Sequence, residues 1–491
     1  MRTPAMKRLA TLVLAALLAG CSGFIPPRAP LPEAAALNKP TAQGSFIGTS
    51  NGYVAQEPVP DAWWRLYDSR TLDGLVQQAL AANTDLRTAA ANLLKAQAAL
   101  DLASAAQEPS TTLSAQPSFA RRSAQEELHP GKPFPSKFVY GAGFGVSYQV
   151  DLFGQIQRSI DAAQADVGSA TAARDAARVS VVAETTRAYL ELCSAGREIV
   201  VAQNQVSLQA RSTELTRRLA VHGRGTPVDV DRSSAQEEQV RASIPTLEAQ
   251  RRVAMYRLAA LTGRTPRELP EELGRCDQEP RLAKPIPIGD GAALLRRRPD
   301  IRRAEFDVLS ASDRIGVVTG ELYPKVALGA SIGSVGVDQH ALRSDSFKFS
   351  LGPLISWEFP DRTRVKARIR AAQADREALL ARFDGVVLTA LKETESALEV
   401  HARDQERRII LESARTQAQN AARDTQRLFE AGRIGYLPVL DALRTLSQIE
   451  QSVAAAESRV AADQVNLFLA LGGGWDDEAT PRSPPLRPMQ P

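Results

Sequence analysis

The amino-acid sequence predicts an α+β membrane protein built as a tandem structural repeat, with four transmembrane β-strands and four long helices in each chain. Three observations predict this fold class. Short motifs recur in the same order in both halves, four segments alternate between apolar and small polar residues, and apolar residues recur every three or four positions over very long stretches. A length of 491 residues alone suggests about three domains of ~150 residues, but the repeat favours one architecture that occurs twice.

The first twenty residues form a predicted lipoprotein signal peptide. Arg2, Lys7 and Arg8 precede a short apolar run, which ends in a Leu-Ala-Gly-Cys sequence at residues 18–21. The run is too short to span a membrane as a mature helix. The small residues before Cys21 resemble a bacterial lipobox, so Cys21 is predicted to be acylated and to become the mature N-terminus. A plain signal peptide with a chance cysteine is the alternative.

Residues 21–60 are expected to be a lipidated, extended tether, because they are rich in Pro, Ala and Gly. Ser22 follows Cys21 where inner-membrane lipoproteins often carry Asp, and this difference favours the outer membrane. Several acyl groups bind a bilayer firmly, whereas a single one binds weakly. At the other end of the chain, residues 476–491 are expected to be a flexible, Pro-rich tail.

The body of the chain repeats itself. Gly223-Arg224 recurs as Gly432-Arg433, 209 residues later, and other short motifs recur at nearly the same offset. Chance matches would scatter, but these keep their order along the chain, which indicates a tandem duplication. The first repeat, the link and the second repeat cover residues 61–273, 274–289 and 290–475.

Each repeat is expected to contain a helix, two strands and two long helices. Apolar residues from Ile160 to Leu192 form a stripe at helical spacing. A helix of about 64 residues is ~100 Å long, so it needs parallel neighbours to cover such a stripe. The expected long helices cover residues 156–219, 228–261, 364–429 and 437–471, and a helix before the first strands covers 72–102.

The strands indicate the environment. Residues 138–151 and 347–359 carry aromatic side chains on one face and Gly, Ser and charge on the other, and each follows a shorter alternating run, at 111–119 and 324–332. A half-buried soluble sheet also alternates, but the length and the aromatic face match a transmembrane barrel wall. The residues predicted to face lipid are Phe138, Tyr140, Phe144, Tyr148, Phe347, Phe349 and Trp357.

Four strands cannot close a barrel around water, and an open sheet edge cannot sit in lipid. Several chains must therefore share one barrel. Three chains would supply twelve strands and twelve long helices. The expected assembly is a trimer, with a 12-stranded β-barrel in the outer membrane that continues as a long periplasmic α-helical barrel.

Composition excludes several other functions. The chain has 60 basic and 56 acidic residues, which argues against a broad nucleic-acid-binding surface. Four scattered histidines argue against a metal site, and no catalytic constellation or cofactor motif is found, so no enzyme is predicted. Cys193 and Cys276 are expected to be unpaired thiols, with a periplasmic disulfide as the alternative. The basic run Arg296-Arg297-Arg298 is expected to be a solvated face.

These features together resemble the outer membrane efflux protein family. The resemblance covers about residues 18–475, and it is to the TolC-like channels, most closely their NodT-type lipoprotein branch. Its most specific elements are an Arg-Pro-Asp-Ile-Arg sequence at residues 298–302 and a Leu-x-x-x-Asp turn at residues 437–441. In this family a glycine-containing turn usually precedes the second long helix pair, whereas this chain has Pro360 and Thr363 there.

The resemblance implies a passive, homotrimeric export duct in the outer membrane, lipid-anchored at Cys21. A periplasmic adaptor, or membrane fusion protein, would join it to an inner-membrane pump driven by protons or ATP, and the proton-driven RND type is expected. No cofactor and no nucleic acid are expected. The alternatives are a periplasmic coiled-coil scaffold or adaptor lipoprotein without a pore, and a secreted enzyme.

The turns between the long helices are predicted at residues 221–227 and 431–438, where Gly and Pro stop and restart the helices. They are expected at the far periplasmic tip. Family tips meet the adaptor, so the resemblance implies four contact residues, although tight αα-turns alone would also explain the sequence. These residues are Gly223, Arg224, Gly432 and Arg433.

Leu437 and Asp441 are four residues apart and share one helix face beyond the second turn. The pore constriction of the family maps onto this spacing, which implies a channel gate made of a leucine ring and an aspartate ring. A solvated Asp441 beside a core Leu437 is the alternative. The first repeat has Val228-Asp229 at the start of the corresponding helix, so the two tips need not gate alike.

Overall fold

The computed structural model describes residues 32, 35–49, 52–121, 123, 131, 135–337, 343–357 and 362–473. The predicted signal peptide, Cys21 and the Pro-rich tail lie outside these residues. The described chain forms two compact units. One contains residues 93–170 and 304–383, and the other contains residues 32–92, 171–303 and 384–473.

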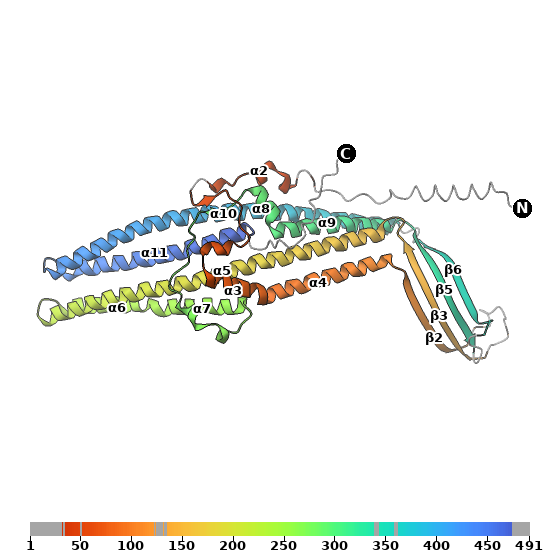
Figure 1. Cartoon of the computed structure of the whole chain (residues 1–491), viewed down its shortest axis with the longest axis horizontal. Helices are drawn as coiled ribbons and strands as arrows, with labels where there is room; N and C mark the ends of the chain where they lie inside the picture. Colours follow the sequence, from red (N-terminus) through yellow and green to blue (C-terminus); the bar gives the residue numbers. More distant parts are fainter. Residues whose placement is uncertain are drawn as a thin grey trace. The chain divides into compact units, whose positions relative to one another are not determined.

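An antiparallel sheet of four strands lies in the first unit, in the order β2-β3-β5-β6 (Figure 1). The first repeat supplies β2 and β3 and the second supplies β5 and β6, so the central pairing of β3 with β5 joins the repeats. All four strands were predicted, each within a few residues of its bounds. They are β2 (Ser110–Ala120), β3 (Lys137–Val150), β5 (Lys325–Val337) and β6 (Phe347–Ser356).

Three of the four expected long helices agree with the structure, and the fourth, at residues 228–261, is divided. Helix α5 (Gln155–Val221) has 67 residues and α10 (Arg362–Glu430) has 69, and each is followed by a return helix. The remaining α-helices are α2 (Pro40–Gln43), α3 (Arg70–Ala82), α4 (Thr84–Ser104), α6 (Pro227–Arg241), α7 (Ser243–Leu261), α8 (Gly291–Arg297), α9 (Pro299–Gly320) and α11 (Tyr436–Ala470). Short 3-10 helices are η1 (Ala36–Asn38), η2 (Ile47–Thr49), η3 (Trp63–Tyr67), η4 (Ala105–Gln107), η5 (Pro266–Glu268) and η6 (Glu271–Arg275).

Two expected helices are each divided in the structure. The helix over 72–102 breaks between α3 and α4 at Asn83, whose side-chain oxygen accepts the amide hydrogens of Asp85 at 2.8 Å and Leu86 at 3.2 Å and so caps α4. The helix over 228–261 breaks between α6 and α7. Pro245, in the first turn of α7, has no amide hydrogen to donate to the carbonyl of Arg241, so it interrupts the helical hydrogen-bond ladder.

Glycines end the helices of both repeats at matching positions. Gly223 ends α5 at a φ of 72°, and the amide of Arg224 donates to the carbonyl of Leu219, which is the Schellman arrangement. Gly432 ends α10 in the same way, 209 residues later. A second matching pair after the return helices is Gly263 and Gly472. This conserved spacing of helix ends supports the tandem repeat in three dimensions.

The turn before the second long helix departs from this symmetry. Gly154 precedes α5 at a φ of 71°, and its counterpart 209 residues later is Thr363. Thr363 lies in the first turn of α10, where the helical backbone needs no glycine. Pro360 lies outside the described residues.

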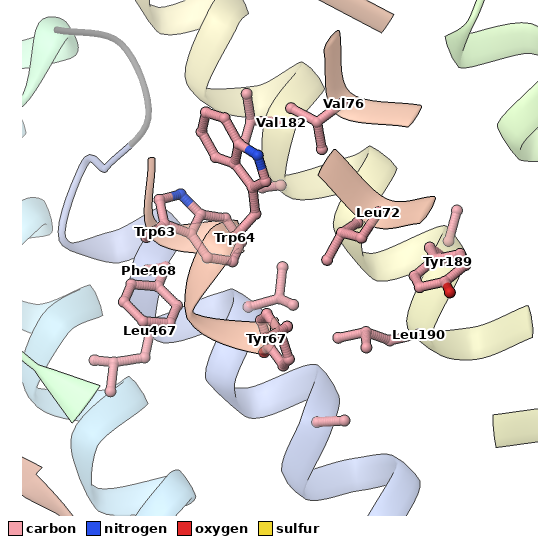
Figure 2. Packing of buried hydrophobic residues seen from close by; sticks show 14 of the residues in the cluster. Trp63, Trp64, Tyr67, Leu72, Val76, Val182, Tyr189, Leu190, Leu467 and Phe468 are labelled. Atoms are coloured by element: carbon pink, nitrogen blue, oxygen red, sulfur yellow. The ribbon is translucent and has the colours of Figure 1, made fainter. Parts of the chain in front are cut away.

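A large hydrophobic core lies in the second unit and combines residues from both repeats. The ring of Trp63, on η3, stacks on Phe468 of α11 with centroids 4.5 Å apart (Figure 2). Trp63 is completely buried, and Leu72 of α3 and Leu192 of α5 pack in the same cluster. Burial of such large side chains stabilises the fold by about 1.5–3 kcal/mol each.

The prediction of an extended tether is wrong for residues 35–49 and 52–60. Short helices η1 and α2 occur there, and the amide of Ala36 donates to Asp384 of α10 at 2.8 Å. The amide of Ile47 likewise donates to Glu395 at 2.8 Å. Further on, β1 (Val54–Ala55) pairs in parallel with β4 (Ile286–Pro287) in the link. This part of the chain is therefore bound to the body of the protein, because α10 and the link supply partners for its backbone.

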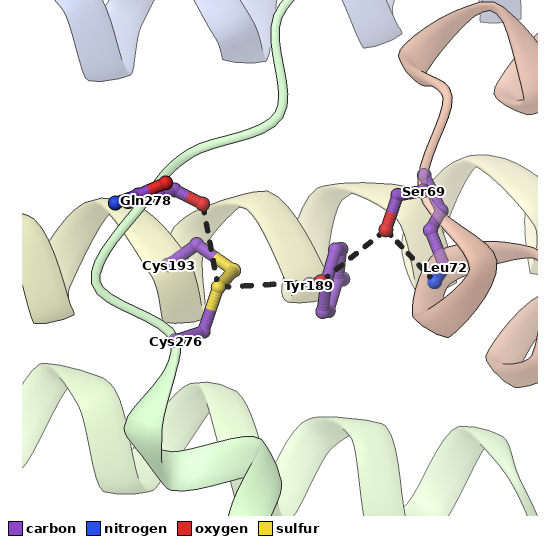
Figure 3. Close-up of a disulfide and its surroundings, with 6 residues drawn as sticks. All are labelled: Ser69, Leu72, Tyr189, Cys193, Cys276 and Gln278. Carbon is purple, nitrogen blue, oxygen red and sulfur yellow. Dashed lines mark hydrogen bonds between the residues drawn. A yellow bond between two sulfur atoms is a disulfide. The ribbon is translucent and has the colours of Figure 1, made fainter.

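The expectation of unpaired thiols is wrong. Cys193, fully buried in α5, forms a disulfide with Cys276 in the link, and their Cα atoms are 4.8 Å apart (Figure 3). The link can approach α5 closely because residue 196, one turn further along the helix, is glycine. A Cβ at this position would overlap the carbonyl oxygen of Cys276. The hydroxyl of Tyr189 lies 4.0 Å from the sulfur of Cys276 and 3.4 Å from Ser69 Oγ. The disulfide therefore fastens the link to α5.

The disulfide should make a large contribution to stability, because its cysteines are 83 residues apart. The chain-entropy relation gives about 4–5 kcal/mol for a loop of this length. We expect Cys193→Ala with Cys276→Ala to lower the midpoint of thermal unfolding in detergent. Reductant should lower the wild-type midpoint to a similar value and leave the double variant unchanged. Equal midpoints for the two proteins without reductant would contradict the expectation.

Candidate functional site

One face of the sheet is apolar across all four strands. The strand register places Leu113, Phe144, Ile332 and Phe349 in one row, so their side chains lie on the same face. All four are exposed in the single chain. The predicted residues Phe138, Tyr140, Tyr148 and Phe347 share this face by the same alternation, and Trp357 continues it directly after β6.

The opposite face carries mainly small and polar residues around its middle. The neighbouring row contains Ser114, Gly143, Gly333 and Lys348. A Cβ at Gly333 would lie 2.6 Å from the carbonyl oxygen of Ala142, so this position needs glycine. A Cβ at Gly143 would meet nothing closer than Ser114 Oγ, at 3.4 Å. The sheet therefore has one apolar and one polar surface, as its sequence predicted.

The two predicted tip turns lie next to one another in the second unit. A Cβ placed on Gly432 would lie 3.6 Å from the Nη2 atom of Arg224. Gly223, Arg224, Gly432 and Arg433 are all exposed, so the structure leaves them accessible. This arrangement provides two basic, glycine-ended turns side by side.

The candidate gate residues lie just beyond the second turn. Leu437 and Asp441 are in the first two turns of α11, and both side chains are exposed, Leu437 at 60%. Leu437 therefore does not belong to the core of the single chain. The adjacent Tyr436, Val439 and Leu440 are buried and form a small cluster with Phe429 packed against it.

A buried set of polar side chains behind Tyr436 was not predicted. The hydroxyl of Tyr436 lies 3.0 Å from Ser212 Oγ of α5 and donates to Ser233 Oγ of α6 at 2.8 Å. Single Ser and Thr residues on long helices give no sequence signal for such a contact, because more than 200 residues separate them from Tyr436.

The prediction that the basic run at residues 296–298 forms a solvated face is wrong for Arg298. This residue is buried and donates to the carbonyl of Ala470 at 2.8 Å, to Asp300 at 2.7 Å and to Glu393 at 2.9 Å. Burial alone would lower the pKa of Arg298, but the hydrogen bonds and charges of Asp300 and Glu393 raise it above its usual value. The Arg-Pro-Asp sequence thus holds the end of α11.

A second charged cluster joins the link to two helices. Arg281 of the link pairs with Glu457 of α11 at 2.7 Å, and Arg197 of α5 pairs with the same carboxylate. Glu279 lies 3.8 Å from Arg197. Burial raises the pKa of Glu279 to about 7, although both arginines oppose this shift. The cluster reinforces the disulfide in holding the link.

Within the described residues, no group of three or more His, Cys, Asp or Glu side chains could hold a metal ion. No helix in the described part of the chain combines the length and the hydropathy needed to cross a bilayer.

A family model described as outer membrane efflux protein matches residues 75–264 and 292–473. The chain belongs to the outer membrane efflux protein family. The two matched segments lie within the two predicted repeats, residues 61–273 and 290–475.

Full-length relatives agree with this assignment. Nodulation protein T of Rhizobium leguminosarum bv. viciae is 28% identical over 476 residues, which cover 95% of this chain and 94% of the relative. Outer membrane protein OprJ of Pseudomonas aeruginosa is 27% identical over 487 residues, covering 97% and 98%. The solved structure of the outer-membrane channel OprN is 32% identical with a TM-score of 0.84, covering 92% of this chain and 99% of that one. The TolC-like fold, the outer-membrane location and the efflux-channel function are therefore confirmed for this efflux protein.

Proposed function

We propose that three copies of the chain form one passive export duct through the outer membrane. The observation that carries this proposal is the four-stranded sheet with one apolar face. Among the described strands, β2 and β6 each have one neighbour, so their outer backbone groups need partners in lipid. Twelve strands from three chains satisfy them in a closed barrel, with the apolar face toward lipid and the polar face toward the lumen.

In this proposal the channel is passive, and a partner protein supplies the energy for transport. The proposed partners of the chain are an inner-membrane pump of the proton-driven RND type and a periplasmic adaptor. The adaptor meets the exposed tip turns at Gly223, Arg224, Gly432 and Arg433. Two arginines beside glycine-ended helix termini offer an acidic or carbonyl-rich adaptor tip both charge and accessible backbone.

The gate is assigned to Leu437 and Asp441. In a trimer each residue forms a ring of three. The leucines exclude water, and the aspartates favour cations while they repel one another. The exposure of Leu437 in the single chain supports this assignment, because a core role would bury it.

We predict that an arginine at Phe144 impairs assembly. A lipid-facing arginine near the bilayer midplane costs about 2–4 kcal/mol in each chain. Phe144→Arg should therefore reduce the amount of trimer in outer-membrane extracts, and Trp357→Arg should also reduce it. Gly143→Ser is the matched control on the polar face, where the structure leaves room for a side chain. Equal tolerance at these positions, or a monomer by native mass spectrometry, would contradict the barrel.

Cys21 is proposed as the lipid anchor, and its substitution tests this directly. Cys21→Ser should abolish incorporation of labelled palmitate, because serine lacks the thiol that is acylated. Some channel function should survive, since the barrel itself anchors the protein in the membrane. Labelling at the wild-type level in the variant would reject Cys21 as the lipidation site.

Removal of both gate residues should open the duct. Leu437→Ala with Asp441→Ala should raise single-channel conductance in planar bilayers and make cells sensitive to vancomycin without a pump. Val228→Ala with Arg232→Ala is the control at the matching positions of the first repeat. Wild-type conductance in a correctly assembled double variant would place the constriction elsewhere.

A further inference from the structure

The four strands of the sheet carry charged residues of one sign only. These residues are Lys137 of β3, Lys325 of β5 and Lys348 of β6, and no Asp or Glu occurs in any of the four strands. The whole chain has nearly equal numbers of basic and acidic residues, 60 and 56. The excess of positive charge is therefore a local property of the sheet.

All three lysines lie on the polar face. Lys348 pairs with Gly333, which in turn pairs with Gly143, so Lys348 lies in the middle row of that face. Lys137 comes six residues before Gly143 on β3, and Lys325 comes eight residues before Gly333 on β5. Even spacings keep side chains on one face, and these two correspond to about 20 Å and 27 Å along the strands. In the proposed barrel the lysines therefore form rings at three levels, with Lys348 in the middle ring.

Lys348 has no acidic residue on the strands beside it. Strand β6 pairs with β5, and in the proposed trimer its other edge meets β2 of the next copy, and neither β5 nor β2 contains Asp or Glu. Lys348 is exposed, and no carboxylate among the described residues pairs with its ammonium group. A Cβ at Gly333 would lie 3.5 Å from the Cε atom of Lys348, so the lysine stem lies over glycine. Lys325 differs, because it begins β5 at the end of the sheet where Asp151 follows β3.

The charge of such a ring would extend across the whole lumen. A 12-stranded barrel with strands about 4.8 Å apart and tilted by about 40° has a radius of about 12 Å at the backbone. An extended lysine side chain reaches ~6 Å, which leaves its ammonium group about 6 Å from the axis. This distance is shorter than the Debye length of about 8 Å at physiological ionic strength. Coulomb's law in water with this screening gives, for three such groups, about a fivefold enrichment of a monovalent anion at the axis.

We propose that Lys348 is a specificity-determining residue of the duct, whose ring of three ammonium groups favours cargo that carries negative charge. This inference rests on the proposed trimeric barrel and deepens it by naming an anionic class of cargo. The Gly and Ser residues in the same row of the sheet supply no competing charge. The proposed ring of Asp441 has the opposite sign, so it opposes the preference of the barrel in the intact duct.

The test measures ion selectivity in planar bilayers. The parent protein is the full-length trimer with Leu437→Ala and Asp441→Ala, because it lacks the aspartate ring. The reversal potential across a threefold KCl gradient, up to about 0.15 M, gives the ratio of chloride to potassium permeability. We expect Lys348→Gln to lower this ratio about two- to fivefold, since other parts of the duct lie in series with the ring. Lys348→Glu should lower it further, and Lys348→Arg is the matched control, which keeps the charge and should keep the ratio.

Three further measurements separate charge from side-chain shape and ions from cargo. Lys348→Gln with Ser350→Lys moves the charge two residues along the same face and should restore the ratio. At about 1 M KCl the Debye length is only ~3 Å, so the difference between the parent and Lys348→Gln should nearly vanish. Proteoliposomes loaded with carboxyfluorescein, an organic anion, should release it more slowly with Lys348→Gln than with the parent. Release of glucose, which is neutral, should be equal for the two proteins.

The outcomes separate the lysine ring from the duct. If the parent forms no conducting trimer, the proposed function fails and the inference fails with it. If the parent conducts and Lys348→Gln has the same permeability ratio, the inference is overturned and the duct stands. An equal loss of selectivity with Lys348→Arg, or no recovery with Ser350→Lys, would also overturn the inference, because charge on this face would then not be the cause. A difference that persists at 1 M KCl would count against it for the same reason.

Discussion

The pairing of β3 with β5 holds together the sheet on which the membrane part depends. Each repeat supplies only a two-stranded hairpin, and an isolated hairpin is marginally stable in water. The ladder from Val139↔Val337 to Val150↔Val326 converts two hairpins into one surface with a continuous apolar face. It also leaves one edge strand from each repeat. In the proposed trimer, β6 of one copy meets β2 of the next, so a single kind of contact closes the ring.

The two repeats share their framework but differ where function is proposed. Matching glycines end the helices in both, and the core around Trp63 and Phe468 draws on both. At the tips the symmetry is lost. Thr226 and Asp229 cap the first return helix, whereas no side chain caps the second, and Tyr436 at its start bonds to Ser212 and Ser233 of the other hairpin. The repeats therefore share one frame and differ at their tips.

The sequence was informative where a pattern is local and periodic. Alternation with a period of two located all four strands, and helical spacing located the long helices, because both signals lie in consecutive residues. The break at Pro245 was missed, although proline at this place in a helix is a local signal. The break at Asn83 depends on which partner its side chain finds, which sequence alone does not decide.

Contacts between distant segments could not be read from the sequence. The disulfide of Cys193 with Cys276 needs their proximity across 83 residues, and the burial of Arg298 needs Glu393 and the end of α11. The roles of Leu437 and the other predicted site residues stay predictions, although the tip turns could be located from their Gly and Pro residues. The hydroxyl chain at Tyr436 could not, because Ser and Thr are ordinary residues on a helix.

The disulfide also has a consequence for how the protein is made. Thiols stay reduced in the cytoplasm, so this bond closes only after export. Cys193 precedes Cys276 by 83 residues, so in export from the N-terminus the bond cannot close until the segment that forms α6 and α7 has also been exported. The chain has three cysteines, and acylation of Cys21 would remove one from thiol chemistry. In that case one intramolecular pairing would remain, and the protein would mature without a disulfide-shuffling step.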